Sequence, residues 1–310
     1  MTATRSLNAY MGMTVRNIKV YAKDKLAIML SMLTQVIVLG LYLMFLKSTY
    51  VDAINGSLGA LKDLVTSADV DALVNSWLVS GVIGTSVVTV ALNSLSVMVS
   101  DKQEKIDYDY NATSVKGSTV VMSYFSGAVA TTVLMSSILL TAGLVFLSID
   151  GIITYTFMDL LKIYGLVILG SISSTLVLMS FVSFFKKSST LSSFGIMVSA
   201  AIGFVIGAYI PVSSFSKEVQ TAVNVVPGSQ IAGAMRNVLM GPALENIDSA
   251  LNGVDGGQFI ESAKNIFAVN LNLFDHTADM KFMMTYSAIA IAIFLILNIV
   301  LYGFSSKRRD

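Results

Sequence analysis

The chain contains no cysteine, one histidine, three prolines and one tryptophan in 310 residues. The absence of cysteine excludes disulfide bonds, thiolate metal ligands and a cysteine nucleophile. A single histidine does not build a metal site alone, so we expect no metal in this chain and expect His276 to be an exposed loop residue. The net charge is +1, which gives no reason to expect nucleic acid as a partner.

Charged residues are also scarce. They make up 13% of the chain, whereas hydrophobic residues make up 55% and the mean hydropathy is +0.75. An average soluble domain is about a quarter charged, and a helical membrane crossing needs roughly 20 apolar residues. We therefore predict an all-α polytopic membrane protein that forms a single transmembrane domain over residues 1–310. Its six predicted transmembrane helices cover 26–46, 72–100, 119–147, 163–185, 189–210 and 282–304.

The distribution of charge predicts the orientation of these helices. If the N-terminus is cytoplasmic, thirteen of the 20 Lys and Arg residues lie on the cytoplasmic side, and thirteen of the 19 acidic residues lie on the other side. The positive-inside rule then places both termini in the cytoplasm. The composition is compatible with a bacterial plasma (inner) membrane. Segment 26–46 is too long for the apolar core of a cleavable signal peptide.

Residues 1–25 have the pattern of an amphipathic helix. At 100° per residue, one face carries Leu7, Tyr10, Met11, Thr14, Ile18 and Tyr21, and the opposite face carries Arg5, Arg16, Lys19 and Lys23. Such a helix suits the inner membrane surface. The alternative is a solvated basic tail that only fixes the topology.

The predicted loop between the second and third spans is dense in both charge signs. Its candidate docking residues are Asp101, Glu104, Lys105, Asp107, Tyr108 and Lys116. Charged and aromatic residues that alternate in this way favour docking to another protein. A plain polar turn between antiparallel helices is the alternative.

The fifth span carries small residues at strict four-residue spacing: Gly195, Ser199, Gly203 and Gly207. Such a stripe lets another helix approach closely. The partner helix belongs either to the same chain or to a second protomer, and the spacing does not choose between them.

All three prolines lie between residues 211 and 242. Pro211, Pro227 and Pro242 divide this apolar stretch into two pieces of about a dozen residues, the length of re-entrant or interfacial helices. We predict a short re-entrant helical hairpin in the outer leaflet at 211–242. We expect Ser229 to cap its second helix, and Arg236 to face headgroups or a carboxylate at the outer interface.

The remaining outer segments are expected to be loops. The connection between the first two spans, about 25 residues long, provides no large domain for substrate capture. Residues 243–281 read as a solvated loop with one amphipathic helix around Phe259 to Phe274.

Enzymatic motifs are missing. The fragment at Lys116 to Thr119 is not a phosphate-binding loop, and neither G-x-S-x-G nor H-E-x-x-H occurs. We therefore expect no enzyme, no catalytic residues and no cofactor in this chain, and we expect any nucleotide hydrolysis to come from another chain. No acid or base lies centrally in a predicted span, which counts against a stand-alone secondary transporter.

Six spans, an amphipathic N-terminus and a charged loop after the second span resemble the ABC-2 type permeases, the membrane subunits of type V ABC exporters. In SDKQEKIDYDYNATSVKGSTVVMSYF, Glu104 and Lys116 match the acidic and basic positions of the family's coupling element, with Asp107 and Tyr108 between them. The proline common in that motif is replaced by Ser114 or Val115. The stretch from Pro211 to Gly241 resembles the family's proline-bearing hairpin after the fifth span.

This resemblance implies a permease that acts with separate ATP-binding subunits, which carry the ATP and Mg²⁺. It also implies a second permease copy or a sister permease, with the glycine stripe at their interface. The resemblance favours an amphiphilic substrate, such as a drug or an antimicrobial peptide. Export of such a substrate implies a role in multidrug or antibiotic resistance. The alternatives are a permease that exports a lipid or a lipid-linked glycan, and a non-transporting membrane sensor or scaffold.

Overall fold

The computed structural model describes residues 3–149, 151–274 and 276–307. Arg308 and Arg309, counted above among the cytoplasmic charges, lie outside this part. Within it, six helical segments are long and apolar enough to cross a membrane, as predicted. They are Lys25–Leu64, Ser67–Gln103, Gly117–Ser148, Phe157–Val182, Ser188–Val205 and Met280–Leu301.

The first of these segments is longer than the sequence pattern predicts. Helix α2 (Lys25–Leu41) continues through a π-helical turn (Tyr42–Leu46) into α3 (Lys47–Leu58) and a 3₁₀ turn (Gly59–Leu64). The predicted loop between the first two spans is therefore mostly helical. Gly59 ends α3 because it adopts a positive φ of 55°, which favours glycine.

Helix α4 (Ser67–Ser94) is the central helix of the bundle and is buried along most of its length. It contacts α2, α7, α8, α9, α11 and α12. Small residues allow this close packing: a β-carbon on Gly81 would lie 2.9 Å from the Ala208 backbone, and one on Gly84 would lie 2.9 Å from Ile206. The side chain of Thr66 caps the helix by accepting from the Asp69 N–H.

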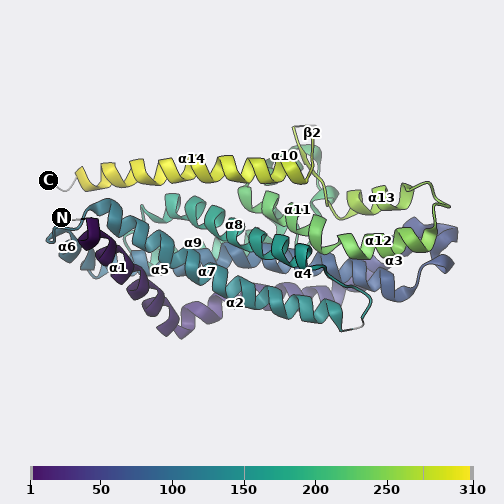
Figure 1. Ribbon diagram of the computed structural model, residues 1–310, viewed down its shortest axis with the longest axis horizontal. Helices are drawn as coiled ribbons and strands as arrows, with labels where there is room; N and C mark the ends of the chain where they lie inside the picture. The colour runs from purple at the N-terminus through teal and green to yellow at the C-terminus, as the bar shows by residue number, and fades with distance from the viewer. Residues whose placement is uncertain (1–2, 150, 275, 308–310) are drawn as a thin grey trace.

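The other long helices surround α4 in an elongated bundle (Figure 1). Their bounds are α7 (Gly117–Ser148), α8 (Phe157–Val182), α9 (Ser188–Val205) and α14 (Met280–Lys307). One end of the bundle holds α5 (Ser96–Gln103), α6 (Ile106–Asn111), α1 (Ala3–Lys23) and the last turns of α14. The opposite end holds α3, α12 (Gly241–Leu251) and α13 (Gln258–Ile266).

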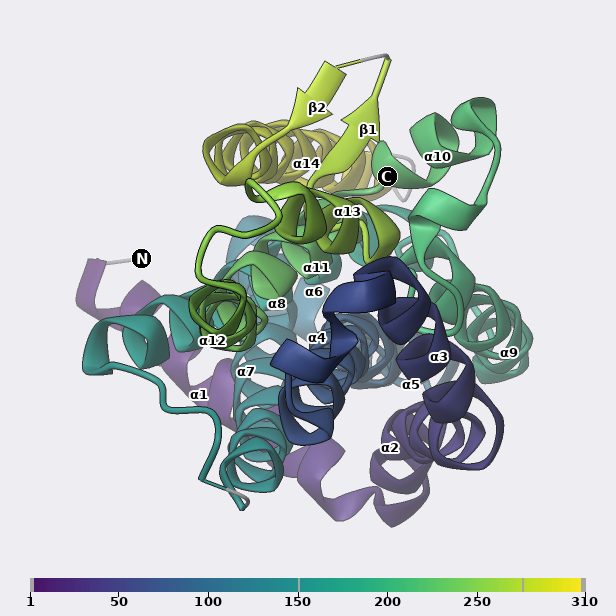
Figure 2. The same cartoon turned by 90° about the vertical axis from the view of Figure 1, so that its right-hand side faces the viewer.

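The fold is helical as predicted, apart from a short two-stranded antiparallel ribbon that the sequence did not indicate. β1 (Leu271–Leu273) pairs with β2 (His276–Ala278), beside α14 and α10 (Lys217–Asn224) in Figure 2. His276 lies exposed in β2 rather than in a loop. The helix expected up to Phe274 ends at Ile266, since Ala268 adopts a positive φ of 49° that interrupts the helix.

Three aromatic rings join the elements at the α12–α13 end. The ring centroids of Tyr50 and Trp77 are 4.7 Å apart, and those of Trp77 and Phe267 are 5.5 Å apart. These residues come from α3, α4 and the end of α13. Edge-to-face and tilted contacts at these distances stabilise packing beyond simple burial.

Candidate functional site

Helices α5 and α6 form a compact element that continues from the end of α4. Lys105, between them, adopts a left-handed conformation with φ 62° and turns the chain. Glu104, Lys105, Tyr108, Asp109 and Lys116 are exposed, and Tyr108 is exposed over 60% of its surface. Asp107 is half-buried. The element presents both charge signs and an aromatic ring to solvent, and its docking role stays a prediction.

Asp101 does not belong to this exposed surface, which corrects its assignment as a docking residue. It is 2% exposed and accepts two hydrogen bonds from the Arg16 guanidinium, one of them from Nη2 to Oδ1 at 2.8 Å. The Tyr124 hydroxyl of α7 donates to the same carboxylate at 2.5 Å. A bidentate arginine–carboxylate pair of this kind sets the relative orientation of the two side chains and also neutralises their charges. Asp101 therefore acts as an internal anchor.

The position of Arg16 also differs from the sequence prediction, which placed it on the polar face opposite the membrane-facing residues. Its side chain turns inward and is 33% exposed. The hydrogen bond from Arg16 to Asp101 raises the pKa of the guanidinium. We define Arg16, Asp101 and Tyr124 as the anchor triad, which joins α1, α5 and α7.

Two further contacts tie α5 to the connection between α8 and α9. The Lys102 ammonium donates to the Ser183 carbonyl at 2.6 Å, and Gln103 Oε1 accepts from the Ser188 N–H at 2.7 Å. These bonds link α5 to the ends of α8 and α9, in addition to its link to α1 through Arg16.

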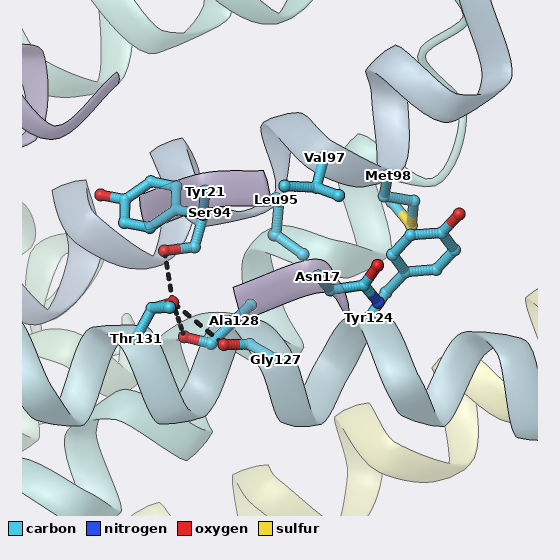
Figure 3. A pocket seen from close by; sticks show the side chains of 10 residues that line it. All are labelled: Asn17, Tyr21, Ser94, Leu95, Val97, Met98, Tyr124, Gly127, Ala128 and Thr131. Atoms are coloured by element: carbon cyan, nitrogen blue, oxygen red, sulfur yellow. Dashed lines mark hydrogen bonds between the residues drawn. The ribbon is translucent and has the colours of Figure 1, made fainter. Parts of the chain in front are cut away.

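Helix α1 packs directly on α7. The Tyr10 hydroxyl and Ser126 Oγ are 2.5 Å apart. A β-carbon on Gly127 would lie 3.0 Å from the Asn17 side chain, so glycine permits the close approach. The small depression drawn in Figure 3 lies at this junction and has no room for a water molecule. This junction is a packed contact rather than a ligand site.

The glycine stripe does not form one continuous helical face. Helix α9 ends at Val205, so Gly207 lies beyond it with a φ of 75°. The space at Gly203 is filled by the Tyr209 ring of the same chain, while Gly195 and Ser199 are half-buried. The two C-terminal members therefore serve contacts within the chain. Nothing in the described residues tests the proposed role of Gly195 and Ser199 between protomers.

The three prolines mark the turns that were predicted from them. Pro211 precedes a 3₁₀ turn (Val212–Ser214), Pro227 is the first residue of α11 (Pro227–Leu239), and Pro242 lies in the first turn of α12. Proline suits the first turn of a helix because the N–H it lacks would have no partner there. Ser229 is not the cap of α11; its hydroxyl bonds to the carbonyls of Val205 and Val223.

Helix α11 is buried over almost its whole length and packs against α4, α8 and α14. Arg236 on this helix is fully buried and donates to the carbonyls of Ala268, at 3.1 Å, and of Ile206 and Gly207. It faces neither headgroups nor a carboxylate, which corrects the expectation for this residue. Burial lowers the pKa of Arg236 to about 10, so the side chain stays charged at neutral pH.

The partners of Arg236 explain how a buried cation is tolerated. Two of its acceptor carbonyls lie just past the C-terminus of α9, where the helix dipole favours positive charge. Nη1 and Nη2 replace lost hydration with hydrogen bonds to these carbonyls, whereas Nε, also buried, makes no hydrogen bond. Arg236 therefore joins α11 to the end of α9 and to the segment after α13.

No group of three His, Asp or Glu residues in the part of the chain that the structure describes lies close enough to hold a metal ion. Comparison of the chain with known protein families, characterised proteins and solved structures gives no match. The anchor triad escaped the sequence prediction because its members are far apart in the chain. The excess of acidic over basic residues near Asp101 indicated that one of these acids could pair with a distant base. It did not identify Arg16 as that base.

Proposed function

We propose that this chain is the permease subunit of an ATP-driven exporter that moves an amphiphilic substrate, such as a drug or an antimicrobial peptide, out of a bacterial cell. Six long apolar helices support a membrane-embedded body. The observation that carries the proposal is the α5–α6 element, which is charged and exposed on one side and tied to four long-range positions on the other.

The geometry suits transmission of a mechanical signal. A partner that binds Glu104, Lys105 and Tyr108 would push on an element that cannot move alone. Arg16 would pass the displacement to α1, and Ser183 and Ser188 would pass it to α8 and α9. In this proposal the α5–α6 end is cytoplasmic and meets a separate ATP-binding subunit, which supplies ATP and Mg²⁺.

The proposal includes a second copy of this chain, or a sister permease, that lies beside it in the plane of the membrane. Half-buried Gly195 and Ser199 on α9, beside exposed Ile196 and Met197, are the positions we assign to that contact. In this proposal α10 and α11, the two helices of the predicted hairpin, face the exit side; they lie toward the α12–α13 end of the bundle (Figure 1).

The test is assembly with an identified partner. The chain is purified with each ATP-binding subunit encoded in its genome, and complex formation, ATPase rate and ATP-dependent uptake of a lipophilic dye into inside-out vesicles are measured. We expect one subunit to form a complex. Combining Glu104→Lys, Lys105→Glu and Tyr108→Ala should weaken that complex at least tenfold.

The matched control is the pair Glu261→Lys and Lys264→Glu on α13, at the opposite end of the bundle. It changes charges similarly and should leave assembly intact. If no ATP-binding subunit associates and no dye moves, the exporter proposal is wrong and a sensor or scaffold role gains support. If a complex forms equally well with the α5–α6 variant, the coupling assignment is wrong.

A further inference from the structure

Helix α1 lies obliquely to the spans, which run along the length of the molecule (Figure 1), and it packs on α7. It meets the first span, α2, at Asp24, the single residue between the two helices. Leu26 and Met29, in the first two turns of α2, are exposed over 66% and 69% of their surface. Apolar surface that is open to a membrane therefore begins directly where α1 ends.

The face of α1 that the sequence assigned to the membrane is divided in the structure. Tyr10 packs inward, with its hydroxyl 2.5 Å from Ser126 Oγ of α7. Tyr21 is buried as well, and its hydroxyl donates to Ser31 Oγ of α2 at 3.2 Å. The part that stays open is a row of exposed apolar side chains at four-residue spacing: Leu7, Met11 and Val15.

This row starts on the edge of α1 that points away from α5. Arg16 follows Leu7 by nine residues, which is half a turn around the helix at about 100° per residue. The Arg16 side chain bonds to Asp101 of α5, and α5 lies at the end of the bundle (Figure 1). Leu7 and Met11, about 40° apart around the helix, therefore face away from that end, toward the level of the spans.

Exposed basic residues lie between these two edges, about 120–160° around the helix from Leu7: Arg5, Lys19 and Lys23. Helix α1 contains no acidic residue. Asp24, which follows it, is exposed, but its carboxylate already accepts from the Ala27 N–H at 2.9 Å, and exposed Lys25 lies next to it in the chain. The outward surface of α1 is therefore positively charged directly beside an apolar row.

We propose that α1 selectively binds anionic phospholipids of the leaflet that it meets. The apolar row packs on the acyl chains, and the three basic residues bind phosphate oxygens at the headgroup level. A basic amphipathic helix is attracted to anionic lipid, and each Lys or Arg near such a surface strengthens binding about fivefold. An acidic protein would match the charge but not an apolar row at the level of the spans. The proposal requires that the spans cross a membrane, and it is independent of the export function.

The probe is phospholipid brominated on its acyl chains, which quenches a nearby fluorophore. Because the chain has no cysteine, Met11→Cys gives a single site for a bimane label on the apolar row. The full chain is placed in nanodiscs of phosphatidylcholine and phosphatidylglycerol, with one or the other lipid brominated. We expect phosphatidylglycerol to be preferred about tenfold at the label, less so at high salt. A label at Gly12→Cys, exposed on the basic side, should be quenched less by either lipid.

Three sets of substitutions in the Met11→Cys background locate the selectivity. Combining Arg5→Gln, Lys19→Gln and Lys23→Gln should bring the preference close to one. Combining Arg5→Lys, Lys19→Arg and Lys23→Arg keeps the charge and should keep the preference. The control removes the same number of charges toward the α12–α13 end of the bundle and should also keep the preference: Lys62→Gln, Lys217→Gln and Lys264→Gln.

Three results would overturn the proposal. Equal quenching by the two lipids would show that α1 meets the membrane without selecting charge. Loss of the preference in the lysine control, to the same extent as in the α1 variant, would assign it to the net charge of the whole chain. Quenching of the Met11 label by aqueous iodide but by neither lipid would place the row outside the membrane, where an acidic protein partner would be the next candidate. Each result leaves the export proposal to its own test of assembly.

Discussion

The guanidinium of Arg236 lies against Gly207, at the place where any other residue would carry its β-carbon. A β-carbon on Gly207 would lie 2.9 Å from Arg236 Nη2 and 2.8 Å from the Val212 side chain. The Gly207 carbonyl accepts a hydrogen bond from that same nitrogen at 3.2 Å. Glycine is therefore required here twice, for its positive φ of 75° and for the space it leaves to the arginine.

We expect Gly207→Ala to lower the free energy of unfolding by about 2–4 kcal/mol, since it adds backbone strain and displaces the Arg236 side chain. Thermal unfolding in detergent, followed by tryptophan fluorescence and size exclusion, measures the change. Gly12→Ala is the control, because Gly12 lies in α1 with nothing near its missing β-carbon. Gly12→Ala should leave stability unchanged or raise it slightly. Equal effects of the two variants would contradict this account of Gly207.

The Arg16–Asp101 pair should couple strongly. Asp101 is almost fully buried, so removal of its cationic partner leaves a buried charge and costs more than an exposed ion pair would. A double-mutant cycle with Arg16→Met and Asp101→Asn should give a coupling energy of about 1–3 kcal/mol. Hydrogen exchange of α1 amides should rise in both single variants.

The control for this cycle is the exposed pair Lys162 and Asp159, whose charged atoms are 3.3 Å apart on one helical face. Its coupling should stay below about 0.5 kcal/mol. Additive effects of Arg16→Met and Asp101→Asn would show that α1 is held by Tyr10 and its other contacts instead.

Asp255 should make the start of α13 sensitive to acid. Its carboxylate accepts from the N–H groups of Phe259, at 2.8 Å, and Gly257, at 3.2 Å, and these bonds lower its pKa below 3.8. Because the folded pKa is lowered, the stabilisation is present above pH 3.8 and is lost as the pH falls through the folded pKa. Hydrogen exchange of α13 should therefore rise only below about pH 4, and Asp255→Asn should remove that dependence. A rise that persists in Asp255→Asn would assign the effect to another group.

Much of the fold follows from local sequence patterns. The six apolar segments are predictable because a run of twenty uncharged residues has few alternatives to a membrane helix. The breaks at Pro211, Pro227 and Pro242 are predictable because proline cannot lie in a helix interior without cost. The exposed charges of α5–α6 follow from the same reasoning.

The remaining features depend on contacts between distant residues. Nothing local to Asp101 distinguishes it from Glu104, yet one is buried and the other is exposed. Periodicity placed Arg16 on a polar helix face, but tertiary pairing turned it inward. Arg236 was expected at a headgroup interface because an isolated cation is costly in apolar surroundings. Three backbone carbonyls from two separate segments offset that cost.

The contacts of α1 also constrain the order in which the chain can assemble. Arg16 bonds to a residue 85 positions later, Asn17 to one 106 positions later and Tyr10 to one 116 positions later. During synthesis from the N-terminus, α1 is made before any of these partners exist. It must wait until α7 has been completed and inserted. Helix α1 is thus translated well before the residues that hold it, and until they are in place its apolar face needs another surface, such as that of the membrane.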